Sequence, residues 1–279
     1  MAAWAVDLLA EVLADVVLTV AVLMTIVCFN IHHIYRIVVI RQHKKLFERI
    51  VLYRTCSYEA SYDAKKIWIR QQSCARSGMD IKINTFTGGM AETNAYLLQR
   101  DDKAILIDAP LGVCDWVDSL GVSLTDLLLT HQHYDHVEDA ASLSAQGVRL
   151  HAYSAYSQEL TLELLLKQSG IPLKIEPYQV DNVLGNNAEL EAAGWHFRLE
   201  HVPGHATDSL VFLTDDLVFA GDTLFAGGVG RADLPGGDMD LLTRGIQEKI
   251  LNLPPESRVF PGHGPQTTVG REIESNPFL

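Results

Sequence analysis

The chain of 279 residues is long enough for one large domain or two modest ones, and it can bury a core without disulfide cross-links. Hydrophobic residues make up 48% of the sequence and charged residues 20%, which excludes a disordered chain and a disulfide scaffold. The formal net charge of −13 argues against a protein that grips the phosphate backbone of nucleic acid.

The charge is unevenly distributed and divides the chain into an N-terminal leader, residues 1–78, and a second segment, residues 79–279. Residues 30–78 contain ten basic and three acidic residues, whereas residues 79–279 contain twelve basic and twenty-nine acidic ones. Only one of the four cysteines, Cys114, lies in the second segment, and this usage fits a reducing compartment. We therefore expect a cytoplasmic domain over residues 79–279, preceded by a leader of different character.

The leader contains an apolar stretch of twenty residues without a charge, from Val16 to Tyr35. As a helix over about residues 12–35, it would be long enough to span a hydrocarbon core of about 30 Å. The basic residues that follow would then face the cytoplasm and contact anionic lipid, so one interpretation is association with the inner membrane through this anchor. Two other interpretations stay open: a buried helix of a globular domain, and a dispensable or mis-extended leader over residues 1–78.

Short β-rich runs alternate with helical patterns in the second segment, which predicts an α/β domain. The expected strands cover residues 81–87, 95–98, 104–108, 126–130, 148–152, 195–202, 210–214, 217–220 and 258–260. Helices are expected at 137–146, 155–168 and 239–251. Glycine and proline cluster over 226–237 in what we expect to be one long loop, and such a loop in a compact domain is more often functional than idle.

Four of the expected strands end in a turn that carries histidine or aspartate. These turns hold seven side chains of the metal-ligand type: His131, His133, Asp135, His136, His205, Asp222 and His263. Because sites gather at the strand ends of α/β sheets, these side chains could converge. Imidazole with carboxylate suits zinc, iron or manganese, and seven ligands suit two ions that share one bridging carboxylate.

Not every histidine has this context. Packing alone gives no reason to crowd three histidines and an aspartate into residues 131–136. His151, His196 and His201 do not lie in such a dense run of ligand-type residues, and we expect them to be hydrogen-bonded core or loop residues. Cys114 is likewise expected to be a small core or loop residue and not a nucleophile.

The order of these motifs resembles that of the metallo-β-lactamase superfamily, and within it the short bacterial glyoxalase II-like, or hydroxyacylglutathione hydrolase-like, enzymes. The matching stretches are GGMAETNAYLL at 88–98, HQHYDH at 131–136, PGH at 203–205, GDTLFAGGVGRADLPGGD at 221–238 and PGHGPQTTVGREIESNPFL at 261–279. The resemblance covers residues 79–279. It implies a four-layer αβ/βα sandwich, with two sheets face to face, helices outside and the metals at one edge.

The resemblance also implies roles for individual residues. It assigns the first metal to His131, His133 and His205, the second to Asp135, His136 and His263, and the bridge to Asp222. Asp108 matches an aspartate that supports the metal ligands from behind, unless it is a simple turn residue. Arg231 matches a basic position near the substrate thiol, where a guanidinium could hold a carboxylate, unless it is a solvated loop arginine.

The function implied by the resemblance is hydrolysis of a small-molecule acyl thioester of the hydroxyacylglutathione type by a metal-bound hydroxide. The cofactors would be two divalent ions, zinc by first expectation, with iron or manganese as alternatives. Asp135, as a proton acceptor, and Asp222, as the bridge, are the candidate catalytic residues. Sixteen residues follow His263, too few for the helical domain with which full-length glyoxalase II enzymes hold glutathione, so a different thioester is an open alternative.

The main alternative is a mononuclear-iron persulfide dioxygenase of the same superfamily. Those enzymes retain the same turns and carry a GRxD stretch, which resembles residues 230–233. A nuclease is disfavoured by the acidic second segment, and a non-enzymatic scaffold by the seven ligand-type residues. The zinc β-lactamases that use a cysteine ligand have Cys at the position of Asp222 and often Arg at that of His136, so we do not expect antibiotic hydrolysis.

Overall fold

The computed structural model describes residues 35–40, 49–54, 58–63, 66–71, 82–100 and 102–279. The chain divides into two units, residues 1–78 and 79–279, which we describe one at a time. In the first unit four strands form an antiparallel sheet in chain order: β1 (Tyr35–Ile40), β2 (Arg49–Arg54), β3 (Tyr58–Asp63) and β4 (Lys66–Gln71). The anchor helix expected over about 12–35 lies, but for its last residue, outside the described residues. Within the ranges that are described, no helix has the length and hydrophobicity needed to cross a membrane.

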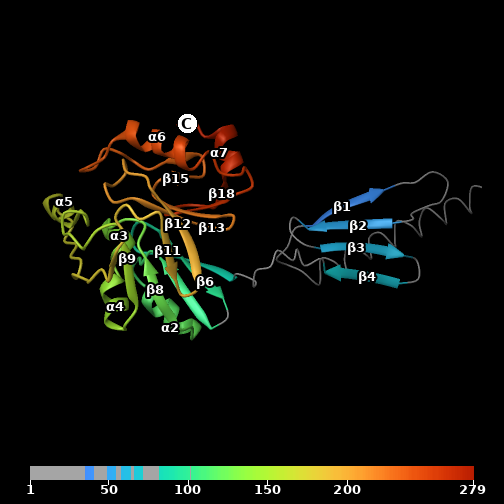
Figure 1. Ribbon diagram of the computed structural model, residues 1–279, viewed down its shortest axis with the longest axis horizontal. Coiled ribbons are helices and arrows are strands. Elements are labelled where there is room, and N and C mark those ends of the chain that lie inside the picture. Colours follow the sequence, from blue (N-terminus) through green and yellow to red (C-terminus); the bar gives the residue numbers. More distant parts are fainter. Residues whose placement is uncertain (1–34, 41–48, 55–57, 64–65, 72–81, 101) are drawn as a thin grey trace, which may run out of the picture. The chain divides into compact units, whose positions relative to one another are not determined.

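The second unit is built on two mixed six-stranded sheets (Figure 1). The first sheet runs in the order β10 (Asn182–Val183), β9 (Arg149–Ala152), β8 (Leu124–Leu128), β7 (Lys103–Ile107), β6 (Thr93–Arg100) and β5 (Lys82–Gly88). The second runs in the order β11 (Glu189–Ala192), β12 (Trp195–His201), β13 (Leu210–Thr214), β14 (Leu217–Gly221), β17 (Arg258–Pro261) and β18 (Thr267–Thr268). A separate short hairpin joins β15 (Leu224–Phe225) to β16 (Gly228–Val229).

Six helices are described in this unit: α2 (Val113–Leu120), α3 (Tyr134–Val137), α4 (Ala140–Ala145), α5 (Glu163–Gln168), α6 (Met239–Lys249) and α7 (Val269–Ser275). In Figure 1, α2 and α4 lie beside the strands of the first sheet, and α6 and α7 lie at the opposite end of the unit. Helix α6 begins at an Asp238 cap, whose carboxylate accepts a hydrogen bond from the amide of Leu241.

Three clusters of buried side chains hold the layers together. The cluster between the two sheets joins Leu98 and Ile105 to Trp195, Phe212 and other buried residues. A second cluster packs the outer face of the first sheet against α2 and α4, and a third packs the outer face of the second sheet against α6. Strands that are buried on both faces become continuous apolar runs, because alternate side chains enter different clusters. The predicted α/β architecture of two facing sheets with outer helices is thus confirmed for the described part of this unit.

Several predicted elements differ in detail from the observed ones. The helix expected at 137–146 begins only at Ala140, after the separate turn α3, and the one expected at 155–168 is confined to α5. The expected loop at 226–237 starts inside the β15–β16 hairpin. Helix α2 was not expected. Its start depends on Asp139, which is distant in the sequence and whose carboxylate accepts hydrogen bonds from the amides of Gly112, just before the helix, and Cys114, in its first turn.

The strand order brings four strand ends to one edge. In the second sheet, β14 pairs in parallel with β17, so Gly221 lies opposite Pro261 at their carboxyl ends. The amide of Leu210 donates to the carbonyl of Thr130, which ties the end of β8 in the first sheet to the start of β13 in the second. Turns that lie far apart in the sequence therefore meet at this edge.

Candidate metal centre

The first turn at this edge follows β8 and alternates its side chains. His131 and His133 lie on one side of the chain, whereas Gln132 between them accepts a hydrogen bond from the Tyr178 hydroxyl and donates to the carbonyl of Ser154. Helix α3 then begins at Tyr134 and adds the buried Asp135 and His136. All four ligand-type side chains of this turn are at most 6% exposed.

The Pro-Gly-His turns depend on the small size of glycine. Gly204 precedes His205 with a φ of 127°, and a Cβ there would lie 2.5 Å from the carbonyl oxygen of Asp238. Gly262 precedes His263, and a Cβ there would lie 2.2 Å from Oδ1 of Asp222. Any other residue would therefore collide with the start of α6 at position 204 and with the cluster itself at position 262.

The seven ligand-type side chains expected from the sequence form three overlapping groups. The groups are His131, His133 and His205; His131, His136 and Asp222; and Asp135, His136 and His263. Within each group the ligand atoms lie within 4.8 Å of one another. Asp222 Oδ1 lies 3.3 Å from His136 Nε2 and Oδ2 lies 3.5 Å from His205 Nε2, so this carboxylate touches members of both outer groups.

The cluster contains buried polar atoms that its surroundings do not satisfy. His131 Nε2, His136 Nε2 and Asp222 Oδ1 have no hydrogen-bond partner among the described residues. A buried polar atom left without a partner costs about 1–3 kcal/mol. These three atoms form the middle group of the cluster, and nitrogen with oxygen donors is the set that a divalent transition metal accepts. The residues present therefore fit a metal centre.

Burial sets the protonation of the first group. Burial, together with the neighbouring His136 and His133, holds the pKa of His131 well below its usual range. Burial and the adjacent His205 lower the pKa of His133 to about 3. Both imidazoles are therefore neutral at pH 7, which is the state that can donate a lone pair to a metal ion.

The two carboxylates of the cluster remain ionised. Burial raises the pKa of Asp135, but nearby His136, with hydrogen bonds from His263 and Thr93, outweighs burial and lowers it to about 2. The same balance with His136 and His263 holds the pKa of Asp222 well below its usual range. The cluster thus contains two ionised carboxylates that could neutralise bound cations.

The outer nitrogen of three histidines is held by an acceptor. His136 Nδ1 lies 2.9 Å from Oδ2 of Asp108, and His205 Nδ1 lies 2.8 Å from the carbonyl oxygen of Arg231. His263 Nδ1 lies 3.0 Å from the carbonyl oxygen of Ala91. Each acceptor holds a proton on Nδ1 and turns Nε2 toward the cluster, as second partners of metal-binding histidines usually do.

Asp108 is placed by a strained turn. Its φ of 60° is uncommon for a residue other than glycine. The carboxylate accepts hydrogen bonds from the amide and the hydroxyl of Thr130, each at 2.8 Å, in addition to its contact with His136. Asp108 therefore lies directly behind the cluster and links the end of β7 to the histidine turn.

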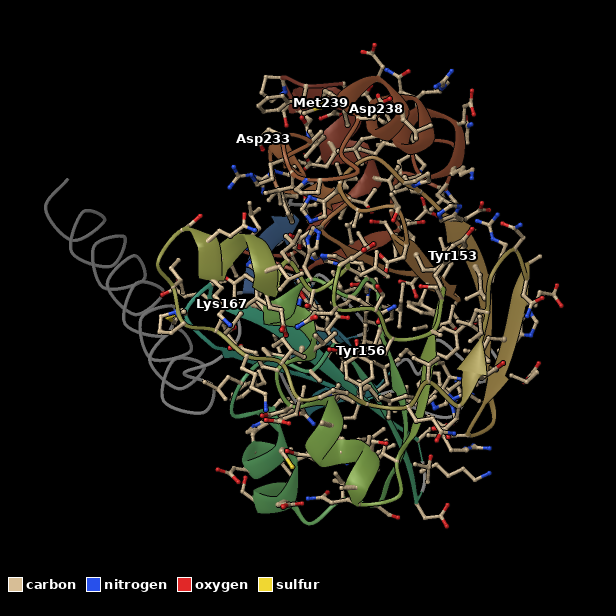
Figure 2. The ribbon with its side chains drawn as sticks, turned by 90° about the vertical axis from the view of Figure 1, so that its left-hand side faces the viewer. Tyr153, Tyr156, Lys167, Asp233, Asp238 and Met239 are labelled. Carbon is tan, nitrogen blue, oxygen red and sulfur yellow. The ribbon has the colours of Figure 1, made fainter. Side chains whose placement is uncertain are left out.

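The side chain of Arg231 is engaged outside the cluster. Its Nε and one terminal nitrogen each lie 2.7 Å from an oxygen of Asp233, and the two side chains are 64% and 68% exposed. Figure 2 shows Asp233 on the loop before α6, on the same side of the unit as Asp238 and Met239. Only the backbone carbonyl of Arg231 touches a ligand-type residue, His205.

The other three histidines of the described residues lie outside the cluster. His151 pairs with the buried Asp126 at 2.8 Å, and His196 pairs with Glu191 at the surface. His201 lies 2.8 Å from the carbonyl oxygen of Thr207. Their prediction as hydrogen-bonded residues is confirmed, and Cys114 is a half-buried thiol that accepts a hydrogen bond from Gln146.

Sequence reasoning did not find Thr93. Its hydroxyl donates to Oδ2 of Asp135 at 2.7 Å, and its backbone forms an isolated bridge with His263. Both partners lie far away in the sequence, so no local pattern could indicate the contact.

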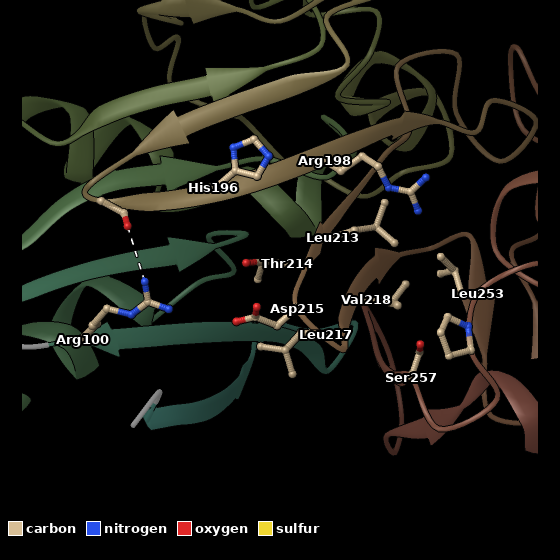
Figure 3. Close-up of a pocket in the computed structure, with 12 residues that line it drawn as sticks. Arg100, His196, Arg198, Leu213, Thr214, Asp215, Leu217, Val218, Leu253 and Ser257 are labelled. Carbon is tan, nitrogen blue, oxygen red and sulfur yellow. Dashed lines mark hydrogen bonds between the residues drawn. The ribbon is translucent and has the colours of Figure 1, made fainter. Parts of the chain in front are cut away.

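A pocket at the other end of the second sheet contains none of the seven residues (Figure 3). It encloses about 340 Å³ between the start of β12 and the turn that joins β13 to β14. Arg100 stacks over the Trp195 ring at 4.1 Å, and the lining residue His196 is paired with Glu191. With one carboxylate, that of Asp215, this pocket lacks the ligand set found at the opposite edge.

A model of the family described as the metallo-beta-lactamase superfamily matches residues 88–263. Hydroxyacylglutathione hydrolase GloC of Haemophilus influenzae is 35% identical over 212 residues, which cover 72% of this chain and 98% of the relative. The probable metallo-hydrolase YqgX of Bacillus subtilis is 33% identical over 200 residues, which cover 68% of this chain and 94% of the relative.

Two solved structures extend this similarity. TTHA1623 in a di-iron-bound form has a TM-score of 0.62 and 33% identity, covering 70% of this chain and 100% of that one. The BLEG-1 B3 metallo-beta-lactamase has a TM-score of 0.66 and 30% identity, covering 71% and 99%.

Proposed function

This chain belongs to the metallo-β-lactamase superfamily, and from that premise we propose that it is a dinuclear metal-dependent thioester hydrolase of the hydroxyacylglutathione type. The observation that carries the proposal is the cluster of seven buried or half-buried histidines and aspartates at one edge of the sheets. The activity named for GloC, which is 35% identical, supports the thioester as substrate.

The ligand groups suggest how two ions would be held. We assign the first ion to His131, His133 and His205, the second to Asp135, His136 and His263, and the bridge to Asp222. The bridging role is supported by the middle group, in which Asp222 joins one histidine from each outer group. Zinc fits this nitrogen and oxygen set, and the di-iron form of TTHA1623 supports iron as an alternative, with manganese as a further one.

Two ions bound there would supply Lewis acidity and a water of lowered pKa. The residues of this chain have separate tasks around them. Asp135, ionised and within 3.2 Å of His263 Nε2, would accept a proton from the attacking water. Asp108 would keep the His136 ring in one orientation.

We propose that Arg231 holds the substrate. Its backbone carbonyl lies against His205, and its exposed guanidinium pairs with Asp233. A carboxylate of the thioester could share this guanidinium or displace Asp233 from it, since a guanidinium binds a carboxylate with two parallel hydrogen bonds.

The proposal is tested by elemental analysis of the purified full-length protein followed by a substrate panel. We expect two divalent ions per chain and hydrolysis of an acylglutathione thioester that a chelator abolishes and added metal restores. Hydrolysis of a coenzyme A thioester alone would keep the reaction and remove glutathione from it. Cleavage of a β-lactam in preference to every thioester would overturn the substrate class.

The alternative of a persulfide dioxygenase is kept because the Arg231–Asp233 ion pair lies in the stretch that resembles the GRxD element. The same preparation distinguishes it. One iron per chain, with oxygen uptake on glutathione persulfide and no thioester cleavage, would replace the proposed hydrolase by the dioxygenase.

We propose that residues 79–279 act on a small molecule in the cytoplasm and do not bind nucleic acid, because this segment carries a large excess of acidic residues. Membrane association through the leader is a further proposal. Fractionation of cells that express the full chain tests it: recovery of all the protein in the soluble fraction would exclude an anchor.

A further inference from the structure

A buried carboxyl group on α7 has no cationic partner among the described residues. Glu272 is 0% exposed, and its two oxygens accept three hydrogen bonds. The donors are the amide of Gly227 at 2.8 Å, the side-chain nitrogen of Asn276 at 2.9 Å and the hydroxyl of Thr267 at 2.5 Å. A buried carboxyl group that loses its hydrogen-bond partners is destabilising, so its three donors must all be held in place.

Two of these contacts join α7 to the short hairpin formed by β15 and β16. Gly227 lies in the turn of the hairpin, with a φ of 74°. The side-chain nitrogen of Asn276, one turn along α7 from Glu272, also donates to the carbonyl oxygen of Gly228 at 3.0 Å. Glu272 and Asn276 therefore hold the amide of one turn residue and the carbonyl of the next.

The hairpin is continuous with the metal centre at both of its ends. It begins two residues after Asp222, and it ends just before Gly230, whose amide donates to the carbonyl of Thr223. A Cβ on Gly230 would lie 2.0 Å from the carbonyl oxygen of Asp222 and 3.0 Å from Cβ of His205, so the backbone here has no room to shift toward the cluster.

Displacement of the hairpin would therefore reach two ligand-type histidines. The carbonyl of Arg231, the residue after Gly230, lies 2.8 Å from His205 Nδ1 and selects its tautomer. The ring of Phe225, on β15, lies edge-on to the ring of His263 with 6.1 Å between the centroids. No comparable contact runs from α7 to these rings directly.

We propose that Glu272 and Asn276 are positioning residues for the metal centre: they fix the β15–β16 hairpin, which sets the orientation of the His205 imidazole and the backbone that carries Arg231. The inference rests on the proposed function of the cluster as a metal site. An acceptor is needed at position 272 because the Gly227 amide and the Asn276 side-chain nitrogen can only donate to it, whereas the Thr267 hydroxyl can also accept.

The test compares Glu272→Ala with Asp126→Ala. Asp126 is another fully buried carboxylate that accepts hydrogen bonds from three side chains, those of Thr125, Arg149 and His151, and it makes no contact with the hairpin. Both variants are expected to unfold at lower urea concentration than the wild-type chain. Titration of the metal-free full-length proteins with Co²⁺, followed by visible absorption, then measures the affinity of each ion.

We expect Glu272→Ala to bind one of two Co²⁺ ions about tenfold more weakly, the usual scale for loss of a group that orients a ligand, while Asp126→Ala binds both like the wild-type chain. Asn276→Ala keeps the carboxylate but removes one of its three donors and the bond to Gly228, so it should weaken the same ion by a smaller factor. Wild-type Co²⁺ affinity and spectra in both α7 variants would overturn the positioning role and leave a packing role only.

The outcomes separate this inference from the proposed function. Failure of the wild-type chain to bind two Co²⁺ ions would count against the dinuclear centre itself. Two Co²⁺ ions in the wild-type chain, with unchanged affinities in Glu272→Ala and Asn276→Ala, would remove only the role of α7.

Discussion

Two groups of buried histidine and aspartate occur in the same domain, and they differ in whether their polar atoms are satisfied. In the first, Asp126 is 0% exposed and accepts hydrogen bonds from Thr125, Arg149 and His151. In the second, the cluster at the sheet edge, atoms of three buried side chains have no hydrogen-bond partner in the described part of the chain.

The contrast shows that residue type alone does not distinguish a structural pair from a metal site. The Asp126 group joins neighbouring strands, since Asp126 on β8 lies opposite Arg149 on β9. The metal cluster instead collects side chains from four separate turns and points their free atoms at one another. We call the Asp126 group closed, because its polar atoms are hydrogen-bonded, and the metal cluster open, because some of its polar atoms have no partner among the described residues. A closed group should contribute to stability alone, whereas an open one should contribute to binding and catalysis.

The largest expected effect is that of Asp222→Ala. This substitution removes the carboxylate that touches both ligand groups, so we expect at least one metal ion to be lost and thioester turnover to fall by about 10³-fold or more. Metal content by elemental analysis and kcat/KM on one preparation measure the two effects. Retention of two ions and of turnover would refute the bridging assignment.

Asp108→Asn is expected to have an intermediate effect on the open group. The amide keeps the volume but loses the charge that faces His136 Nδ1, so metal affinity or kcat should fall by about 10- to 100-fold. A chelator competition and a kcat measurement on the reloaded protein check this. If activity and affinity both stay at wild-type values, Asp108 is a turn residue only.

Asp126→Asn, in the closed group, should lower stability and leave metal binding unchanged. Loss of a buried carboxylate that accepts three hydrogen bonds should lower the free energy of unfolding by about 2 kcal/mol, with metal content and kcat unchanged. Urea unfolding of the chelator-treated protein measures the first quantity, and the assay of the loaded protein the second. A variant that lost metal together with stability would erase the distinction between the two groups.

The smallest expected effect is a pH dependence of the difference in unfolding free energy between the wild-type chain and Asp126→Asn. Burial raises the pKa of Asp126, but hydrogen bonds from His151, Thr125 and Arg149 outweigh burial and lower it below its usual value. A lowered pKa contributes stability above the pKa of the unfolded chain, about 3.9 for aspartate, and this contribution is lost as the pH falls through the folded value. The gap between wild type and Asp126→Asn should therefore narrow from pH 6 to pH 3.

Unfolding of both proteins in the presence of a chelator isolates this effect, because metal loss in acid would otherwise add to it. A gap that stayed constant over that pH range would show that the Asp126 charge contributes nothing to stability.

The ligand-type residues of the site and the central strands could be predicted from the sequence mainly because of the pattern at the strand ends. His131, His205 and Asp222 each follow an apolar run closely, so their convergence follows from the rule that strand ends gather at one edge of a sheet. The central strands were predicted well for the same reason, since residues 210–214 and 217–220 are continuous apolar runs that end at turn residues.

What the sequence could not indicate depends on contacts across long separations. Thr93 reaches Asp135 over 42 positions, and Glu272 reaches Gly227 over 45. The start of α2 depends on Asp139, which lies 27 positions from Gly112. Apolar spacing also overestimated the helix before Gln168, because Leu162 adopts a φ of 58° and the helix can begin only after it.

The spacing of the cluster along the chain has a consequence for how the protein is made and lost. Its ligand-type side chains extend from the turn after β8 of the first sheet, at His131, to the turn after β17 of the second, at His263, so bound ions would close a long loop and cross-link the two halves of the sandwich. This cross-link can form only after both sheets have assembled. In a cell with little of the metal, newly made chains would be degraded by proteases faster than metal-loaded ones, so the cellular level of the protein would depend on the metal supply.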